Sequence, residues 1–309
     1  MGEAPPVQKR ALGLKLVNCP HCNAPLDYSL GETLFTCKYC GYTFSMIKEG
    51  EYKEIAPGKH FMLASSFNEA EMREVISDWM RKGIFKAGDL AEKSKITRME
   101  LRFVPIWIVN VSADSTFHGK KRIVETERRT RPSSKPGEAA TVTRIRKERW
   151  VDKSGNLSHH IDWKILATKG MSLPLDKIKL SIANKIPFKI ENVSQGAKLI
   201  NGDVDEETAK ERTESGIRNY HRDKALSEVD ELQVINTNVQ LGEAQLLTIP
   251  FWFIQYKYKN KLYPIIVNGS SGDVVEGEAP MGKYDILVIG GVIAAVIIII
   301  VIAIALWPR

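Results

Sequence analysis

The chain has 309 residues, of which 43% are hydrophobic and 26% charged, a composition that excludes a chain without hydrophobic cores. Outside a terminal apolar run, about 280 residues remain, enough for one large or two modest domains. The net charge of +7 comes entirely from residues 118–150, which hold eleven Lys or Arg and four Glu.

Four cysteines follow a flexible N-terminal lead that we assign to residues 1–18. They form two pairs, Cys19-x2-Cys22 and Cys37-x2-Cys40, separated by fourteen residues. Each pair is a knuckle that directs two thiolates at one ion, and two knuckles supply the tetrahedral set that Zn²⁺ prefers. Two disulfides, or redox chemistry of one CxxC pair, are the minor alternatives. The spacing therefore predicts a zinc ribbon over residues 19–45 with structural Zn²⁺, although iron in the same site stays open.

Three details belong to this ribbon. Gly41 follows the second pair, where a knuckle commonly needs a positive φ. Residues 26–37 alternate around a Gly turn and predict a small hairpin. Four thiolates already close the site, so we interpret His21, inside the first knuckle, as a bystander.

Residues 46–280 are predicted to form a mostly antiparallel α+β body. The segments VPIWIV at 104–109 and IPFWFI at 249–254 share their Pro and Trp positions, which favours an internal duplication with halves near 60–170 and 171–280. Proline inside such a run indicates a strand start or edge, and the two tryptophans are more typical of a core than of a site. Strands are expected over residues 103–117, 122–127, 141–150, 160–167, 231–238, 247–259 and 262–267.

The sequence predicts two helices. Asn68 is a predicted N-cap, Glu71 completes a capping box, and Gly83 ends the helix. A second, surface helix is expected over residues 203–223 with a cap at Asp205 or nearby. Residues 267–274, VNGSSGDV, predict a hairpin turn.

The basic stretch at 118–150 is predicted to be a long hairpin around a loop rich in Pro, Ser and Gly. It is open to three interpretations: a solvated hairpin, a surface for anionic lipid, or a nucleic-acid surface. Aromatic residues that would stack on bases are sparse, since only Phe117 and Trp150 flank it. The candidate surface residues are Lys120, Lys121, Arg122, Arg128, Arg129, Arg131, Arg144, Arg146, Lys147 and Arg149.

Residues 286–307, ILVIGGVIAAVIIIIVIAIALW, contain no charge. As a helix they would extend about 33 Å, enough to cross a hydrocarbon core of about 30 Å. We therefore expect one transmembrane helix over residues 284–307, a tail-anchored protein of the cell membrane, and the bulk of the chain on the cytoplasmic side.

The ribbon, the segments LRFVPIWIVNVSADSTFHG and LTIPFWFIQYKYKNKLYPIIVNGSSGDVVEGEAP, and the closing apolar run together resemble a prokaryotic family. Its members are labelled transcription-factor-B-type zinc-ribbon proteins, and some relatives carry a primosomal-helicase label. The resemblance covers most of the chain. It implies a fold and a location at the membrane, but no activity. Ser270 and Ser271 stand where relatives tend to have a polar residue followed by Thr, so the resemblance leaves the type of this turn open.

Residues for catalysis are not recognisable. The chain has no GxxxxGK[ST], GxSxG or HExxH motif. The SHH segment at 158–160 follows a KSGN turn, which favours a loop. We therefore expect a binding or scaffolding module for a protein partner and no enzyme. The alternative is a membrane-tethered nucleic-acid-binding or transcription-related regulator that uses the ribbon and the basic hairpin.

Overall fold

The computed structural model describes residues 15–48, 50–83, 86–131, 141–180 and 182–282, together with Ile298 and Ile300. The predicted lead at 1–18 lies outside this part except for its last four residues, which form a strand. The predicted transmembrane helix at 284–307 lies outside it except for Ile298 and Ile300. Within the described residues, no helix is long and apolar enough to cross a membrane.

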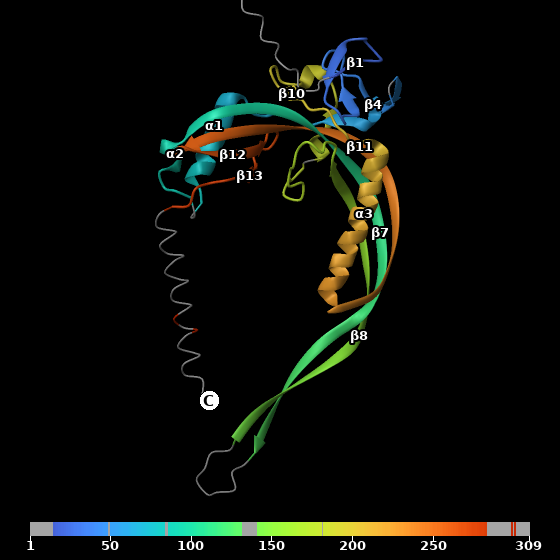
Figure 1. The fold of residues 1–309 in the computed structure, drawn as a ribbon, viewed down its shortest axis with the longest axis vertical. Helices are drawn as coiled ribbons and strands as arrows, with labels where there is room; N and C mark the ends of the chain where they lie inside the picture. The colour runs from blue at the N-terminus through green and yellow to red at the C-terminus, as the bar shows by residue number, and fades with distance from the viewer. Residues whose placement is uncertain are drawn as a thin grey trace, which may run out of the picture. The chain divides into compact units, whose positions relative to one another are not determined.

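The fold is mixed α+β and consists mostly of strands, in agreement with the predicted class (Figure 1). The chain forms two compact units. The first consists of Met1–Ile106, Leu166–Asp205 and Gln245–Arg309, and the second of Trp107–Ile165 and Glu206–Ala244. Because segments of the two units alternate along the chain, the units do not correspond to the two predicted halves at 60–170 and 171–280. The internal duplication of those halves stays a prediction.

The ribbon occupies the start of the first unit. Strands β1 (Lys15–Asn18) and β2 (Pro25–Tyr28) form one antiparallel sheet. Strands β3 (Leu34–Thr36), β4 (Thr43–Lys48) and β5 (Glu51–Glu54) form another. The predicted hairpin within residues 26–37 is wrong, because β2 and β3 belong to different sheets. Each cysteine knuckle itself joins two paired strands, and the turn at Gly31 only links the two sheets.

The rest of the first unit is built on a larger sheet with the order β10–β7–β11–β12–β13, in which β6 pairs with β11 and β9. The pairings of β11 with β12 and of β12 with β13 are antiparallel, whereas β6 with β11 and β10 with β7 are parallel. The strands are β6 (His60–Met62), β7 (Lys95–Arg131), β9 (Ile186–Pro187), β10 (Lys198–Leu199), β11 (Glu231–Tyr258), β12 (Lys261–Asn268) and β13 (Val274–Gly277). Short 3-10 helices are η1 (Pro57–Lys59), η2 (Ile182–Asn184) and η3 (Ile190–Asn192).

The predicted first helix is confirmed as α1 (Glu69–Arg81). The Asn68 side chain accepts from the N–H groups of Ala70 and Glu71, and the Glu71 carboxylate accepts from the Asn68 N–H, which completes the capping box. Gly83 has φ +117° just beyond the helix end. The apolar face of α1 buries Met72, Ile76 and Met80 in a core that also holds Phe103, Trp252 and Tyr256, and the short α2 (Leu90–Lys93) adds Leu90.

The second unit contains α3 (Glu206–Glu228) with the parts of β7, β8 (Thr141–Leu166) and β11 that belong to it. Figure 1 shows α3 lying along β7. The helix buries one narrow stripe, spaced every four residues: Ala209, Thr213, Ile217, His221 and Ala225. Gly216 permits close packing there, since a Cβ would lie 2.6 Å from the Trp163 ring. The remaining faces are mostly polar, as expected for this helix, although Leu226 is 44% exposed.

The strands are longer than the sequence predicts. The first four expected strands merge into β7 and β8, and the next two merge into β11. The predicted KSGN turn is wrong, because residues 153–156 continue β8. Gly155 does not form a turn but leaves room for the Phe117 ring, because a Cβ at position 155 would lie 2.5 Å from that ring. Pro105 and Pro250 lie inside strands and not at their starts. Their carbonyl oxygens accept from Ala167 and Gly269, so pairing continues on that side without a proline N–H.

Two predicted hairpins are present. The β12–β13 turn is closed by the Asn268 N–H donating to the Asp273 carbonyl, with Gly272 at φ +77°. Strands β7 and β8 pair as the two flanks of the basic hairpin. Side-chain partners along them run in opposite directions, from Asn110 with Asp162 near the base to Glu125 with Arg149 farther out. This order is typical of an antiparallel pair. The loop at 132–140 lies outside the described residues.

Candidate metal centre

The two cysteine knuckles have the same backbone geometry. In the first, the Cys19 N–H donates to the Ala24 carbonyl at 2.9 Å, and the Asn23 N–H donates back to the Cys19 carbonyl at 2.9 Å. In the second, the Cys37 N–H donates to the Tyr42 carbonyl and the Gly41 N–H to the Cys37 carbonyl, both at 2.8 Å. Two short sequences therefore fold into matching turns, each of which carries two sulfur atoms.

Each turn requires a left-handed residue directly after its second cysteine. Gly41 has φ +75°, as predicted, and Asn23 occupies the equivalent place with φ +58°. Asparagine is among the few residues that adopt this conformation readily. Sequence reasoning missed Asn23, although its position four residues after Cys19 matches that of Gly41 after Cys37.

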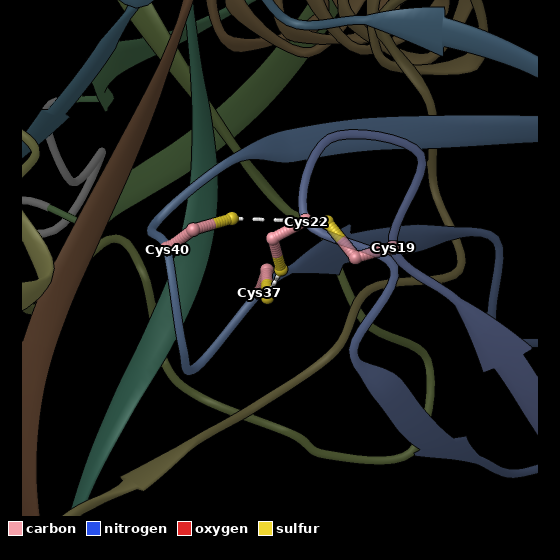
Figure 2. Close-up of side chains that lie close together, drawn as sticks. All are labelled: Cys19, Cys22, Cys37 and Cys40. Atoms are coloured by element: carbon pink, nitrogen blue, oxygen red, sulfur yellow. Dashed lines mark hydrogen bonds between the residues drawn. The ribbon is translucent and has the colours of Figure 1, made fainter.

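The four sulfur atoms converge on one point (Figure 2). The Sγ atoms of Cys19 and Cys40 are 3.7 Å apart, as are those of Cys22 and Cys37, and all four lie within 4.8 Å of one another. A disulfide needs about 2.05 Å, so the cysteines are free thiols. A tetrahedron with Zn–S bonds of about 2.3 Å has S–S edges of about 3.8 Å, which the two shorter separations match. The arrangement therefore fits a four-coordinate metal ion.

Burial around the sulfurs favours the uncharged thiol when no cation is present. Burial raises the pKa of Cys37, and it raises the pKa of Cys40 to about 12. The exposed Cys22 differs, because the backbone N–H of Ala24 lowers its pKa. A divalent cation among four sulfurs reverses this balance, because thiolates are the metal ligands and binding releases their protons.

A small core surrounds the cysteines. Phe35 and Phe44 are fully buried, with ring centroids 5.3 Å apart, and Val17 and Leu26 complete the cluster. A core of this size supplies little stability alone, so the metal would supply much of the remainder. The cluster of possible metal ligands consists of the four cysteines and does not include His21. The His21 ring instead stacks on the Tyr42 ring, with centroids 5.3 Å apart.

His60 is a buried residue that the sequence did not single out. Its Nδ1 lies 3.0 Å from the Thr43 hydroxyl of the ribbon, and its Nε2 lies 2.8 Å from the Thr248 hydroxyl of β11. The ring also stacks on Phe188 at 4.2 Å. Burial lowers the His60 pKa to about 3. The neutral imidazole thus ties the ribbon to the larger sheet, and its distant partners explain why local patterns could not find it.

The predicted basic residues lie along β7 and β8, and several are paired with glutamates. Lys147 contacts Glu127 at 2.9 Å and Arg149 contacts Glu125 at 3.1 Å. Glu148 faces Arg122 at 3.8 Å and Arg146 at 3.5 Å. Lys121, Arg128 and Arg144 are exposed, and Lys120 is half-buried. The side chains of Arg129 and Arg131 lie outside the described part of the chain.

The predicted loop at 158–160 is wrong, because these residues continue β8. His159 Nδ1 lies 3.0 Å from His221 Nε2 of α3, and His221 Nδ1 lies 2.7 Å from the Ser115 hydroxyl. Ser115 also contacts the Thr237 hydroxyl at 2.7 Å. Burial of His221 lowers its pKa. Ser115 is only 3% exposed, and this chain of polar groups satisfies its buried donors and acceptors.

Comparisons with known proteins give no match: no protein-family model, no curated protein and no solved structure matches the chain. The four-cysteine cluster is consistent with a zinc-ribbon-like site, and the family resemblance remains an expectation from sequence.

Proposed function

We propose that this chain is a membrane-anchored zinc-ribbon protein whose ribbon docks a protein partner on the cytoplasmic side, and that it acts by binding and not as an enzyme. The observation that carries the proposal is the convergence of four sulfur atoms within 4.8 Å. A closed four-thiolate zinc site is structural, because a catalytic zinc keeps an open position. When bound, the ion would fix the two knuckles that Cys19, Cys22, Cys37 and Cys40 provide.

The ribbon surface supports protein docking. Leu16, Leu30, Tyr39 and Ile47 are 58–78% exposed there, although each is a large apolar side chain. A groove of about 530 Å³ adjoins the ribbon, where Leu26 and Lys38 face Ile190, Val193 and Leu199. Exposed apolar side chains and grooves with a polar rim are both typical of protein interaction sites. A rigid, metal-held ribbon would present them with little loss of conformational entropy.

Membrane attachment rests on the apolar run at 286–307. Its length suits a single span, and the proposal places the bulk of the chain on the cytoplasmic side. The proposed role is thus to hold a partner near the membrane.

Nucleic-acid binding through the basic hairpin is the competing function. The exposed Arg128 and Arg144 support it. Two other features weaken it: cross-strand glutamates neutralise part of the charge, and Phe117 is 5% exposed and packed on Gly155, so it is not free to stack on a base.

The test is affinity capture of the full-length protein from detergent-solubilised membranes, with and without nuclease. We expect a defined protein partner that survives nuclease and is lost with Cys37→Ser. Leu30→Ser, which changes a side chain that is 78% exposed, should weaken capture while zinc stays bound. Leu226→Ser is the matched control, since Leu226 is 44% exposed on α3, and it should leave capture unchanged.

The opposite result is equally clear. If nuclease clears the captured material, and Arg144→Glu with Arg146→Glu abolishes binding in a salt-dependent manner, the basic hairpin is the working surface. If purified protein turns over a substrate after zinc is removed, the binding-only proposal fails.

A further inference from the structure

A groove of about 930 Å³ in the first unit has an unusual set of charges. It lies between three segments: residues 86–93 with α2, the tip of the β11–β12 hairpin, and residues 280–282. Its lining includes four lysines, at positions 86, 93, 259 and 261, and a single carboxylate, that of Asp89. We call it the lysine groove.

The carboxylate does not neutralise the lysines. Asp89 contacts Lys93 at 2.8 Å and accepts from the Tyr258 hydroxyl, while Lys259 lies 4.0 Å away. The bond from Lys93 lowers the pKa of Asp89 to about 2. Within the described part of the chain, Lys261 contacts no carboxylate. Lys86 donates to the Trp79 carbonyl and lies over the Trp79 ring. The positive excess that an anion could satisfy therefore comes from Lys259 and Lys261.

The hairpin tip places two of the lysines. Lys259 and Asn260 both have positive φ, +45° and +65°, which is the conformation of a two-residue type I′ turn. Such a turn matches the twist of the paired strands, so Lys259 and Lys261 are held at the end of a rigid hairpin. Lys259 also lies over the Tyr258 ring, 4.7 Å from its centroid.

Chain length relates the groove to the expected span. Gly282 lines the groove, and the apolar run begins only four residues later, at Ile286. Four residues extend at most about 14 Å, so a span that starts there holds the groove close to the headgroup layer. Met281 is 58% exposed and Leu262, next to Lys261, is 53% exposed. These apolar side chains suit the boundary between headgroups and acyl chains.

We propose that the lysine groove binds the phosphate of an anionic phospholipid in the leaflet where the chain enters the membrane. The inference rests on the membrane anchor of the proposed function and adds a ligand to it. Lysine is a point charge suited to phosphate, and the adjoining exposed apolar side chains favour a lipid over a free anion. The basic hairpin fits this role less well, since several of its cations already face glutamates.

The experiment titrates full-length protein in neutral detergent with phosphatidylglycerol or phosphatidylcholine and counts bound lipid by native mass spectrometry. We expect tighter binding of phosphatidylglycerol. Each lysine near an anionic lipid surface contributes about fivefold, so Lys259→Gln with Lys261→Gln should reduce the preference about twenty-fivefold. Lys177→Gln with Lys179→Gln is the control, since both lysines are exposed and line no part of the groove, and the preference should remain.

Equal binding of the two lipids, or an unchanged preference in the groove variant, overturns the proposal. Inorganic phosphate that displaces phosphatidylglycerol at matched concentration also overturns it, because the groove is then a free-anion site. Failure of the anchor is a separate result, in which the protein leaves the membrane fraction on cell lysis although the detergent titration still shows lipid preference.

Discussion

Lowering the pH should destabilise the first unit through His60. The imidazole is 3% exposed and bridges the hydroxyls of Thr43 and Thr248, and burial lowers its pKa to about 3 from an ordinary 6.5. The folded chain therefore keeps His60 neutral, whereas the unfolded chain binds a proton as the pH falls below about 6.5. The stability contribution is complete above that pH and is lost progressively as the pH falls towards 3.

The magnitude follows from this difference in pKa. Between about pH 7 and about pH 5, the unfolded state gains most of a proton that the folded state does not bind, which costs about 2 kcal/mol of unfolding free energy. His60→Gln is the reference variant, because its amide can bridge the same two hydroxyls but does not titrate. It should show a shallower fall in stability over the same range.

The assay is urea unfolding of the full chain in detergent, followed by tryptophan fluorescence, with zinc held in excess so that the metal site contributes equally to both proteins. The difference in pH slope between the native protein and His60→Gln isolates the imidazole. Equal slopes, or a native protein that gains stability as the pH falls, would refute a buried neutral His60.

Three substitutions test local geometry. Asn68→Ala removes the capping box of α1 and should cost about 1 kcal/mol of unfolding free energy; an unchanged urea midpoint would contradict this. Gly41→Ala places a Cβ at φ +75°, should cost about 1 kcal/mol, and should weaken zinc binding in a competition with a chelator; equal affinity would show that the knuckle tolerates a side chain. Gly202→Ala would bring a Cβ to 2.6 Å from the Ala167 carbonyl oxygen and should cost about 2 kcal/mol, whereas Gly58→Ala, with open space around it, should be nearly neutral in the same thermal melt.

Features that depend on neighbours in sequence were predictable. The cysteine spacing places four sulfurs together because each knuckle closes within a few residues. The capping box at Asn68 and Glu71 needs only one turn of helix. The turn between β12 and β13 likewise follows from Asn268 and Gly272, which bond to each other.

Features that depend on distant partners were not predictable. Gly155 resembles a turn residue in the sequence, and only the structure shows that it packs against Phe117. His221 was not predicted as a buried residue, because its partner Ser115 is 106 residues away in the sequence. The ribbon hairpin was misplaced because the pattern in residues 26–37 does not reveal which strand is the partner. The lysine groove brings together three segments, and no single one of them is notably basic.

The most direct measurement is the metal content and thiol reactivity of full-length protein purified from membranes without added metal. The convergence of the four cysteines predicts one zinc ion per chain and four thiols that react only after a strong chelator removes it. Protein that contains no metal and carries either four reactive thiols or two disulfides would contradict the metal-held ribbon on which the docking proposal rests.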